Sequence, residues 1–213
     1  MSIAPPRRVR RQPVARKTLS PGAAGIRLTP WEFDQADFEE GWYYELIHGV
    51  LVVSPIPSLG ERDPNEELGH WLRTYRDHHP QGMCLTDTVF EQHVRIGDDR
   101  RRADRVIWIG LGFTPTLETE PTIVVEFVSK GKRNEYRDYE EKSEEYMGID
   151  VQEYWIIDRF RRIMTVFHRT GGKVRKRVIK ENQTFTTPLL PGFELPLGKL
   201  LGRADRWKDK SKE

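Results

Sequence analysis

The chain has 213 residues, 37% of them hydrophobic and 32% charged, a balance that suits one water-soluble domain with its own core. Its aromatic content of 10% argues against wholesale disorder, and its single cysteine, Cys84, excludes an internal disulfide and a cysteine-rich zinc site. No apolar run approaches the ~20 residues of a membrane span and no signal peptide is recognisable, so we expect a cytoplasmic protein without a membrane partner.

The N-terminal segment differs from the rest in composition. Residues 1–17 hold six arginines and lysines and no acid, whereas the whole chain has a net charge of only +2. We therefore predict a disordered basic tail over residues 1–28. The tail is either a solvated extension or a contact for nucleic-acid phosphates, and a transit peptide is a third reading.

Local signals predict the first elements of the folded region. Thr29 and Glu32 have the spacing of a capping box for a short helix that ends near residue 40. Residues 44–53 then predict a β-hairpin, which the prolines of 54–58 end because proline cannot donate to a strand ladder. Apolar residues at helical spacing predict a helix over 63–78.

The second half of the chain alternates strands with one further helix. Strands are predicted at 83–86, 88–96, 103–109, 121–128, 152–158, 163–168 and 173–179. A charged helix over 135–147, ended by Gly148, crosses between the strands at 121–128 and 152–158, which makes them parallel if they share a sheet. These elements predict one mixed α/β domain over residues 29–201, followed by a charged end over 202–213.

Asp104 and Glu126 are acids within otherwise apolar predicted strands. If these strands are neighbours, the two carboxylates meet on one face, where they repel each other unless a cation bridges them. Oxygen ligands suit Mg²⁺ or Mn²⁺, and such an ion polarises a phosphoryl oxygen and lowers the pKa of a bound water. The alternative is that each acid pairs with a nearby arginine: Arg101, Arg102 or Arg105.

Phosphodiester hydrolysis also needs a positive group at the reacting phosphate. The residue two positions after Glu126 shares its face of the strand, but that residue is Val128. Lys130 and Lys132 lie beyond the expected end of the strand, so neither is a natural choice.

The predicted helix offers another lysine. Asp138, Lys142 and Tyr146 follow one another at four-residue steps and form one polar stripe. This stripe either faces the two carboxylates or contains an ordinary exposed ion pair between Asp138 and Lys142.

A series of motifs, in order along residues 29–201, resembles the Uma2 family. The motifs are Tyr44-Glu45-Leu46-Ile47-His48-Gly49, Ser54-Pro55-Ile56-Pro57-Ser58, Ala103-Asp104-Arg105-Val106, Val125-Glu126-Phe127-Val128-Ser129, Asp138…Lys142…Tyr146, Gln152-Glu153-Tyr154-Trp155-Ile156-Ile157-Asp158 and Pro188-Leu189-Leu190-Pro191-Gly192-Phe193. Uma2 proteins are bacterial proteins of restriction-endonuclease type in the PD-(D/E)XK nuclease superfamily. The resemblance implies a restriction-endonuclease-like core, in which helices flank a curved mixed β-sheet.

The same resemblance implies roles for individual residues. Asp104 and Glu126 become catalytic metal ligands, and Glu45 becomes an additional metal or water ligand. Lys142 becomes the catalytic lysine, displaced from position 128 onto the helix, with Asp138 and Tyr146 in support. Three departures from the family pattern, Ala103, His48 and Arg62, leave the central acids and the lysine in place.

The sequence therefore predicts a Mg²⁺- or Mn²⁺-dependent endonuclease that hydrolyses DNA. Arg101, Arg102, Arg161 and Arg162 are predicted DNA contacts, unless they are simply solvated residues of turns. One alternative is a catalytically inactive nuclease-fold module that binds DNA or protein. Another is a protein-interaction or dimerisation domain, for example a homodimer, whose carboxylates are satisfied by arginines.

Overall fold

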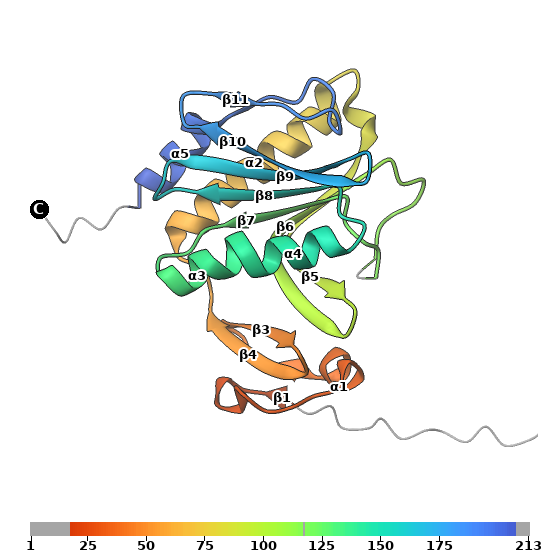
Figure 1. Cartoon of the computed structure of the whole chain (residues 1–213), viewed down its shortest axis with the longest axis vertical. Helices are drawn as coiled ribbons and strands as arrows, with labels where there is room; N and C mark the ends of the chain where they lie inside the picture. The colour runs from red at the N-terminus through yellow and green to blue at the C-terminus, as the bar shows by residue number, and fades with distance from the viewer. Residues whose placement is uncertain (1–17, 117, 208–213) are drawn as a thin grey trace, which may run out of the picture.

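An eight-stranded mixed sheet organises the chain in the computed structural model, which describes residues 18–116 and 118–207 (Figure 1). The strand order is β10-β9-β8-β7-β6-β3-β4, and β5 pairs with β6. The strands are β3 (Trp42–Ile47), β4 (Val50–Pro55), β5 (Leu85–Ile96), β6 (Asp99–Ile109), β7 (Ile123–Phe127), β8 (Glu153–Asp158), β9 (Ile163–Thr170) and β10 (Lys173–Lys180).

The centre of the sheet is the parallel pair β7 and β8, and the other strand pairs are antiparallel. Every residue of these two strands is buried. A strand that is covered on both faces has no face in contact with solvent that would favour polar residues. This explains the near-continuous apolar runs in the sequences of β7 and β8. The predicted parallel crossover is confirmed.

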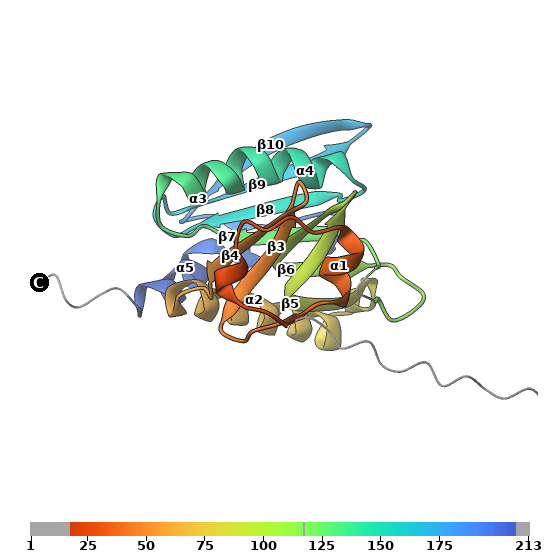
Figure 2. The ribbon, with the colours of Figure 1, turned by 90° about the horizontal axis from the view of Figure 1, so that it is seen from below.

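Helices cover both faces of the sheet (Figure 2). On one face, α2 (Leu59–His78) and α5 (Leu197–Asp205) pack their leucines against the side chains of Val125 and Trp155. On the other face lies one helical segment in three parts, which buries Tyr139 and Tyr146 on Val124 and Tyr154. Its parts are α3 (Lys132–Tyr136), a π-helical turn η3 (Arg137–Glu141) and α4 (Lys142–Gly148).

The N-terminal part of the described chain forms a small layer on the β3–β4 hairpin. It consists of β1 (Thr18–Leu19), the 3₁₀ turn η1 (Pro21–Ala23), α1 (Pro30–Gln35) and β2 (Asp37–Phe38). Leu19 and Phe33 are each 2% exposed and pack on Leu46 and Leu51. The predicted tail boundary at residue 28 is therefore wrong, because 18–28 include buried apolar residues. Residues 1–17, to which the prediction of a basic tail also applies, lie outside the described residues.

Other predicted boundaries also move. Helix α2 begins at Leu59, earlier than predicted, because Ser58 and Glu61 form a capping box in which the Ser58 N–H donates to Glu61 Oε2 at 2.7 Å. The capping box at Thr29 is confirmed, but α1 ends at Gln35. The two strands predicted over 83–96 are the single β5, preceded by the turn η2 (Gly82–Cys84).

The C-terminal region closes the fold with β11 (Thr184–Phe185), β12 (Leu195–Pro196) and α5. Helix α5 continues through Asp205, so the predicted boundary at residue 201 falls inside a helix. Arg203 of this helix donates to Asp63 of α2 at 2.8 Å, which fixes the two helices to each other. Residues 208–213 lie outside the described residues. No helix in 18–116 or 118–207 is long and apolar enough to cross a membrane.

Candidate active site

A cavity of about 440 Å³ opens where the ends of β6 and β7 meet the β3–β4 hairpin and the three-part helix. Glu45, Asp104, Glu126 and Lys142 all line it, so the structure brings the four central predicted residues together. A larger groove of about 610 Å³ lies along α2 and the segment before α5, but it contains none of these four residues.

Asp104 and Glu126 are cross-strand neighbours. The β6–β7 register pairs Arg105 with Val125 and Val106 with Val124, so one step further Asp104 lies opposite Glu126. Asp104 Oδ2 accepts a 2.6 Å hydrogen bond from the N–H of Phe127, which fixes its carboxylate at the end of β7. Opposed like charges on one sheet face destabilise a strand pair, so this arrangement calls for a cation.

The protonation of both acids reflects this crowding. Burial, together with Asp138 and Glu61, raises the pKa of Asp104 to about 6, although Lys142 and the Phe127 N–H act in the opposite sense. Burial also raises the pKa of Glu126 well above its ordinary value, and Asp104 adds to that effect. A bound cation would favour the charged form of both groups.

Lys142 supplies one positive charge at this point. Its Nζ donates to Glu126 Oε1 at 2.6 Å and to the carbonyl oxygen of Arg102 at 3.4 Å. The Tyr146 hydroxyl donates to the same Glu126 oxygen at 3.2 Å. Burial opposes the charged form of Lys142, but Glu126 and Glu45 outweigh it and raise the pKa of the ammonium above its ordinary value.

The π-helical turn shapes the helix face that meets the acids. A π turn adds a residue per turn and is often found at functional sites. Asp138, Lys142 and Tyr146 are all at most 2% exposed, which contradicts the alternative of an exposed Asp138–Lys142 ion pair. Asp138 instead accepts from Arg137 Nε at 3.3 Å, an ion pair to a residue that the sequence prediction did not single out.

Glu45 enters the cavity from β3 and is 4% exposed. Its Oε1 accepts a 3.0 Å hydrogen bond from the backbone N–H of Arg102. Burial alone would raise the pKa of Glu45, but the Lys142 ammonium and this N–H outweigh burial and lower it. Glu45 is therefore held as a carboxylate beside Lys142.

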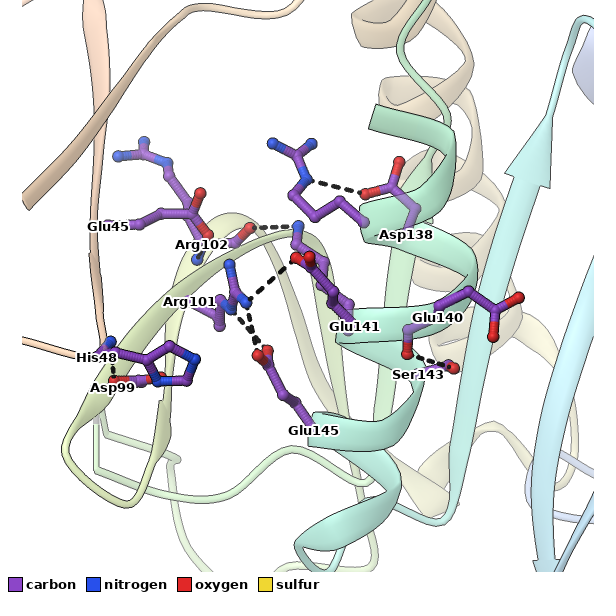
Figure 3. Close-up of polar contacts among 12 residues, drawn as sticks. Glu45, His48, Asp99, Arg101, Arg102, Asp138, Glu140, Glu141, Ser143 and Glu145 are labelled. Atoms are coloured by element: carbon purple, nitrogen blue, oxygen red, sulfur yellow. Dashed lines mark hydrogen bonds and ion pairs between the residues drawn. The ribbon is translucent and has the colours of Figure 1, made fainter. Parts of the chain in front are cut away.

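None of the three nearby arginines forms an ion pair with Asp104 or Glu126 in the described chain. Arg101 donates to both oxygens of Glu145 on α4, at 2.6 and 2.5 Å (Figure 3). Arg102 pairs with Glu91 at 3.2 Å. Arg105 donates to Asn65 and Thr88. The alternative in which arginines neutralise the two acids is wrong.

The predicted DNA contacts separate into two groups. The prediction for Arg101 is wrong, because its side chain is 2% exposed and bound to Glu145. Arg162 is paired with Glu181 and Asp205, so its charge is already offset. Arg102 lines the cavity, and Arg161, paired with Glu135, keeps 54% of its side chain exposed. Contacts of these last two with DNA stay predictions.

Tyr43 and Glu91 were not predicted from the sequence, although they position Arg102. The Arg102 guanidinium lies 3.9 Å from the centre of the Tyr43 ring and also forms an ion pair with Glu91 at 3.2 Å. Glu91 has a positive φ of 55°, which is uncommon for a residue other than glycine. Only the tertiary register reveals this contact, since Glu91 carries no distinctive sequence pattern.

The donor set fits a divalent ion in its chemistry. Asp104 and Glu126 are opposed carboxylates, and each uses one oxygen in the hydrogen bonds above, which leaves Asp104 Oδ1 and Glu126 Oε2 without a hydrogen-bonding partner in the described chain. Among the described residues, however, no group of three or more histidine, cysteine, aspartate and glutamate residues is gathered closely enough to hold an ion. The fit therefore rests on the pair Asp104 and Glu126.

The fold is that of a nuclease-like α/β protein. The chain is similar to the crystal structure of "a putative nuclease belonging to DUF820 from Anabaena variabilis ATCC 29413", with a TM-score of 0.66 and 14% identity, over 83% of this chain and 99% of that one. Residues 30–198 match the model of the Uma2 family, described as "Putative restriction endonuclease", and the chain belongs to this family. No curated protein matches the chain. The predicted family and fold class are confirmed, and both support a nuclease function.

Proposed function

We propose that this protein is a divalent-metal-dependent endonuclease that hydrolyses phosphodiester bonds in DNA. The observation that carries the proposal is the convergence of Asp104, Glu126 and Lys142, from β6, β7 and α4, on the wall of one cavity. Opposed carboxylates and a buried cation are the groups that phosphodiester hydrolysis uses.

Asp104 and Glu126 would hold the ion, which when bound supplies a Lewis acid for the phosphate and acidifies a water. Lys142 has three donor hydrogens, and its two hydrogen bonds leave one for a phosphate oxygen or the attacking water. Tyr146 fixes the shared oxygen of Glu126 from the helix side. Glu45, also on the cavity wall, would accept a hydrogen bond from a water bound to the ion.

Cations at the mouth of the cavity would orient the substrate backbone. Lys130, Arg137 and Arg159 line the cavity together with Arg102. Arg102 is held by its contacts with the Tyr43 ring and Glu91, so its guanidinium loses little freedom when it meets a phosphate.

A plasmid-nicking assay tests the proposal. We expect the full chain to cleave supercoiled DNA with Mg²⁺ or Mn²⁺ and not with EDTA. Asp104→Asn, Glu126→Gln and Lys142→Met should each lower the rate by about 100-fold or more. Glu153→Gln is the matched control, because Glu153 is 5% exposed on β8 and does not line the cavity. Equal cleavage by all five proteins would overturn the assignment.

A binding module of nuclease fold is the second candidate. One observation favours it, namely that the described residues contain no gathered set of three or more metal-ligating side chains. Tight duplex binding in EDTA, without cleavage in Mg²⁺, Mn²⁺ or Ca²⁺, would support this candidate and exclude the hydrolase.

A further inference from the structure

Strand β10 concentrates positive charge at one edge of the sheet. Seven of its eight residues are exposed, and β9 is its one neighbour in the described sheet. Five of the eight are cationic and none is acidic: Lys173, Arg175, Lys176, Arg177 and Lys180.

Within the described residues, the cations of β10 form no ion pairs with acids, although Arg177 acts electrostatically on Glu153. Many basic side chains elsewhere are paired with acids, as in the ion pairs Arg100–Asp34, Arg101–Glu145 and Arg203–Asp63. No ion pair joins a β10 cation to an acid within residues 18–116 and 118–207. The strand therefore presents uncompensated charge to the solvent.

Observed contacts connect this strand to the cavity. The Lys176 ammonium lies 5.9 Å from the centre of the Tyr139 ring, and the Arg161 guanidinium lies 5.1 Å from the same centre. Arg161 in turn pairs with Glu135 of α3, next to Asn134 of the cavity wall. Lys176 of β10 is thus connected to the cavity wall through Tyr139, Arg161 and Glu135.

Two simpler roles account for less of this pattern. Lysines on an edge strand discourage unwanted pairing with other strands, but that role does not need continuity with the cavity. Edge-to-edge pairing with a second copy would place cations opposite cations, which is destabilising. A polyanion is the partner that matches a strand with five cations and no acid.

We propose that β10 is a binding surface for the phosphate backbone of duplex DNA, which it holds outside the cavity. The choice of DNA rests on the proposed function. Lys176 and Lys180 carry the contact on the face that meets the three-part helix, because Lys176 lies over Tyr139 and Phe167 there. Lys176 and Lys180 are about 13 Å apart along β10. Each strand of the DNA presents a phosphate every ~3.4 Å along the helix axis.

Fluorescence anisotropy with a labelled duplex in EDTA tests the surface without hydrolysis. The variant Lys176→Gln/Lys180→Gln should weaken binding by about 10- to 100-fold near 0.1 M salt and lower the slope of log K against log salt by about two. Lys176→Arg/Lys180→Arg keeps the charge and should bind as wild type does. The matched control, Arg27→Gln/Lys199→Gln, removes two exposed cations outside β10 and the cavity and should change binding little.

Four outcomes would overturn the inference. The glutamine variant could bind DNA as wild type does, or the control variant could lose binding equally. The glutamine variant could change only in self-association, or wild-type protein could bind anionic vesicles but not duplex DNA. The proposed function fails separately. If β10-dependent binding persists but wild-type protein with Mg²⁺ or Mn²⁺ cleaves nothing, the surface stands and the hydrolase does not.

Discussion

The ammonium of Lys142 lies 2.6 Å from Oε1 of Glu126, although the two residues come from a helix and a strand. Both side chains are at most 4% exposed. The residue two positions after Glu126 is Val128, just past the end of β7, and it is buried against the helix. The charge that the strand lacks is thus supplied by α4, inside the protein.

Removing one member of this pair should cost more than removing both. Lys142→Met leaves buried carboxylates without their cation, and we expect a loss of about 3–5 kcal/mol of unfolding free energy. The double variant Lys142→Met/Glu126→Gln leaves neither charge and should recover most of that loss while staying inactive in cleavage. Urea unfolding at pH 7 in EDTA measures this cycle, and strictly additive effects would show that the pair is not coupled.

A divalent ion should stabilise the folded protein through Asp104 and Glu126. An ion that binds only the native state adds about 2.7 kcal/mol at a hundred times its dissociation constant. Thermal unfolding with and without Mg²⁺ or Mn²⁺ should therefore show a rise in Tm for wild type and for Glu153→Gln. Asp104→Asn and Glu126→Gln should lose this rise, and a rise of equal size in Asp104→Asn would place the ion elsewhere.

The features that the sequence does predict depend on local rules. Strand periodicity and the crossover rule predict that β7 and β8 are parallel. The proximity of Asp104 and Glu126 can be inferred once β6 and β7 are known to be adjacent strands. The four-residue steps on the helix left two alternatives for Lys142, and the family resemblance selected it as the lysine that the structure places beside Glu126.

The features that the sequence did not predict depend on contacts between distant segments. Arg101 lies three residues from Asp104, but its partner is Glu145, 44 residues away. Residues 18–28 look like a tail because the segment contains Pro21, Gly22 and Gly25, yet Leu19 is buried on the β3–β4 hairpin. The π-helical turn has no spacing signal that separates it from an α-helix.

The ion pair between Asp34 and Arg100 should make stability depend on pH. Asp34 of α1 accepts from Arg100 of β6 at 2.8 and 2.9 Å, and these bonds lower its pKa although burial opposes the shift. A lowered carboxyl pKa contributes stability that is present above the unfolded value of about 3.9 and is lost as the pH falls through the folded value.

Asp34→Asn should therefore lower the unfolding free energy by about 1–3 kcal/mol at pH 7, and its difference from wild type should shrink as the pH falls below about 4. Urea unfolding across pH 3–7 checks this. Asp98→Asn is the control, since Asp98 is exposed in the turn between β5 and β6. A difference that stays constant with pH would show that Asp34 acts through packing.

Gly69 of α2 should be intolerant of alanine because it faces a buried guanidinium. A Cβ at Gly69 would lie 2.5 Å from Arg105 Nη2 and 2.7 Å from its Cζ. Arg105 is 0% exposed, burial lowers its pKa to about 10, and Asn65 and Thr88 hold it by hydrogen bonds. The guanidinium therefore cannot move aside without breaking those bonds.

Gly69→Ala should lower the unfolding free energy by about 2–4 kcal/mol, even though alanine is ordinarily the better helix former. Gly202→Ala is the matched control in α5, where nothing lies within 4 Å of the added methyl group, and it should gain up to about 1 kcal/mol. Because Asn65 also donates to the Asp104 carbonyl oxygen at 2.8 Å, displacement of Arg105 should disturb Asp104 and slow cleavage. A gain in stability for both alanine variants would show that the helix moves away from β6 at little cost.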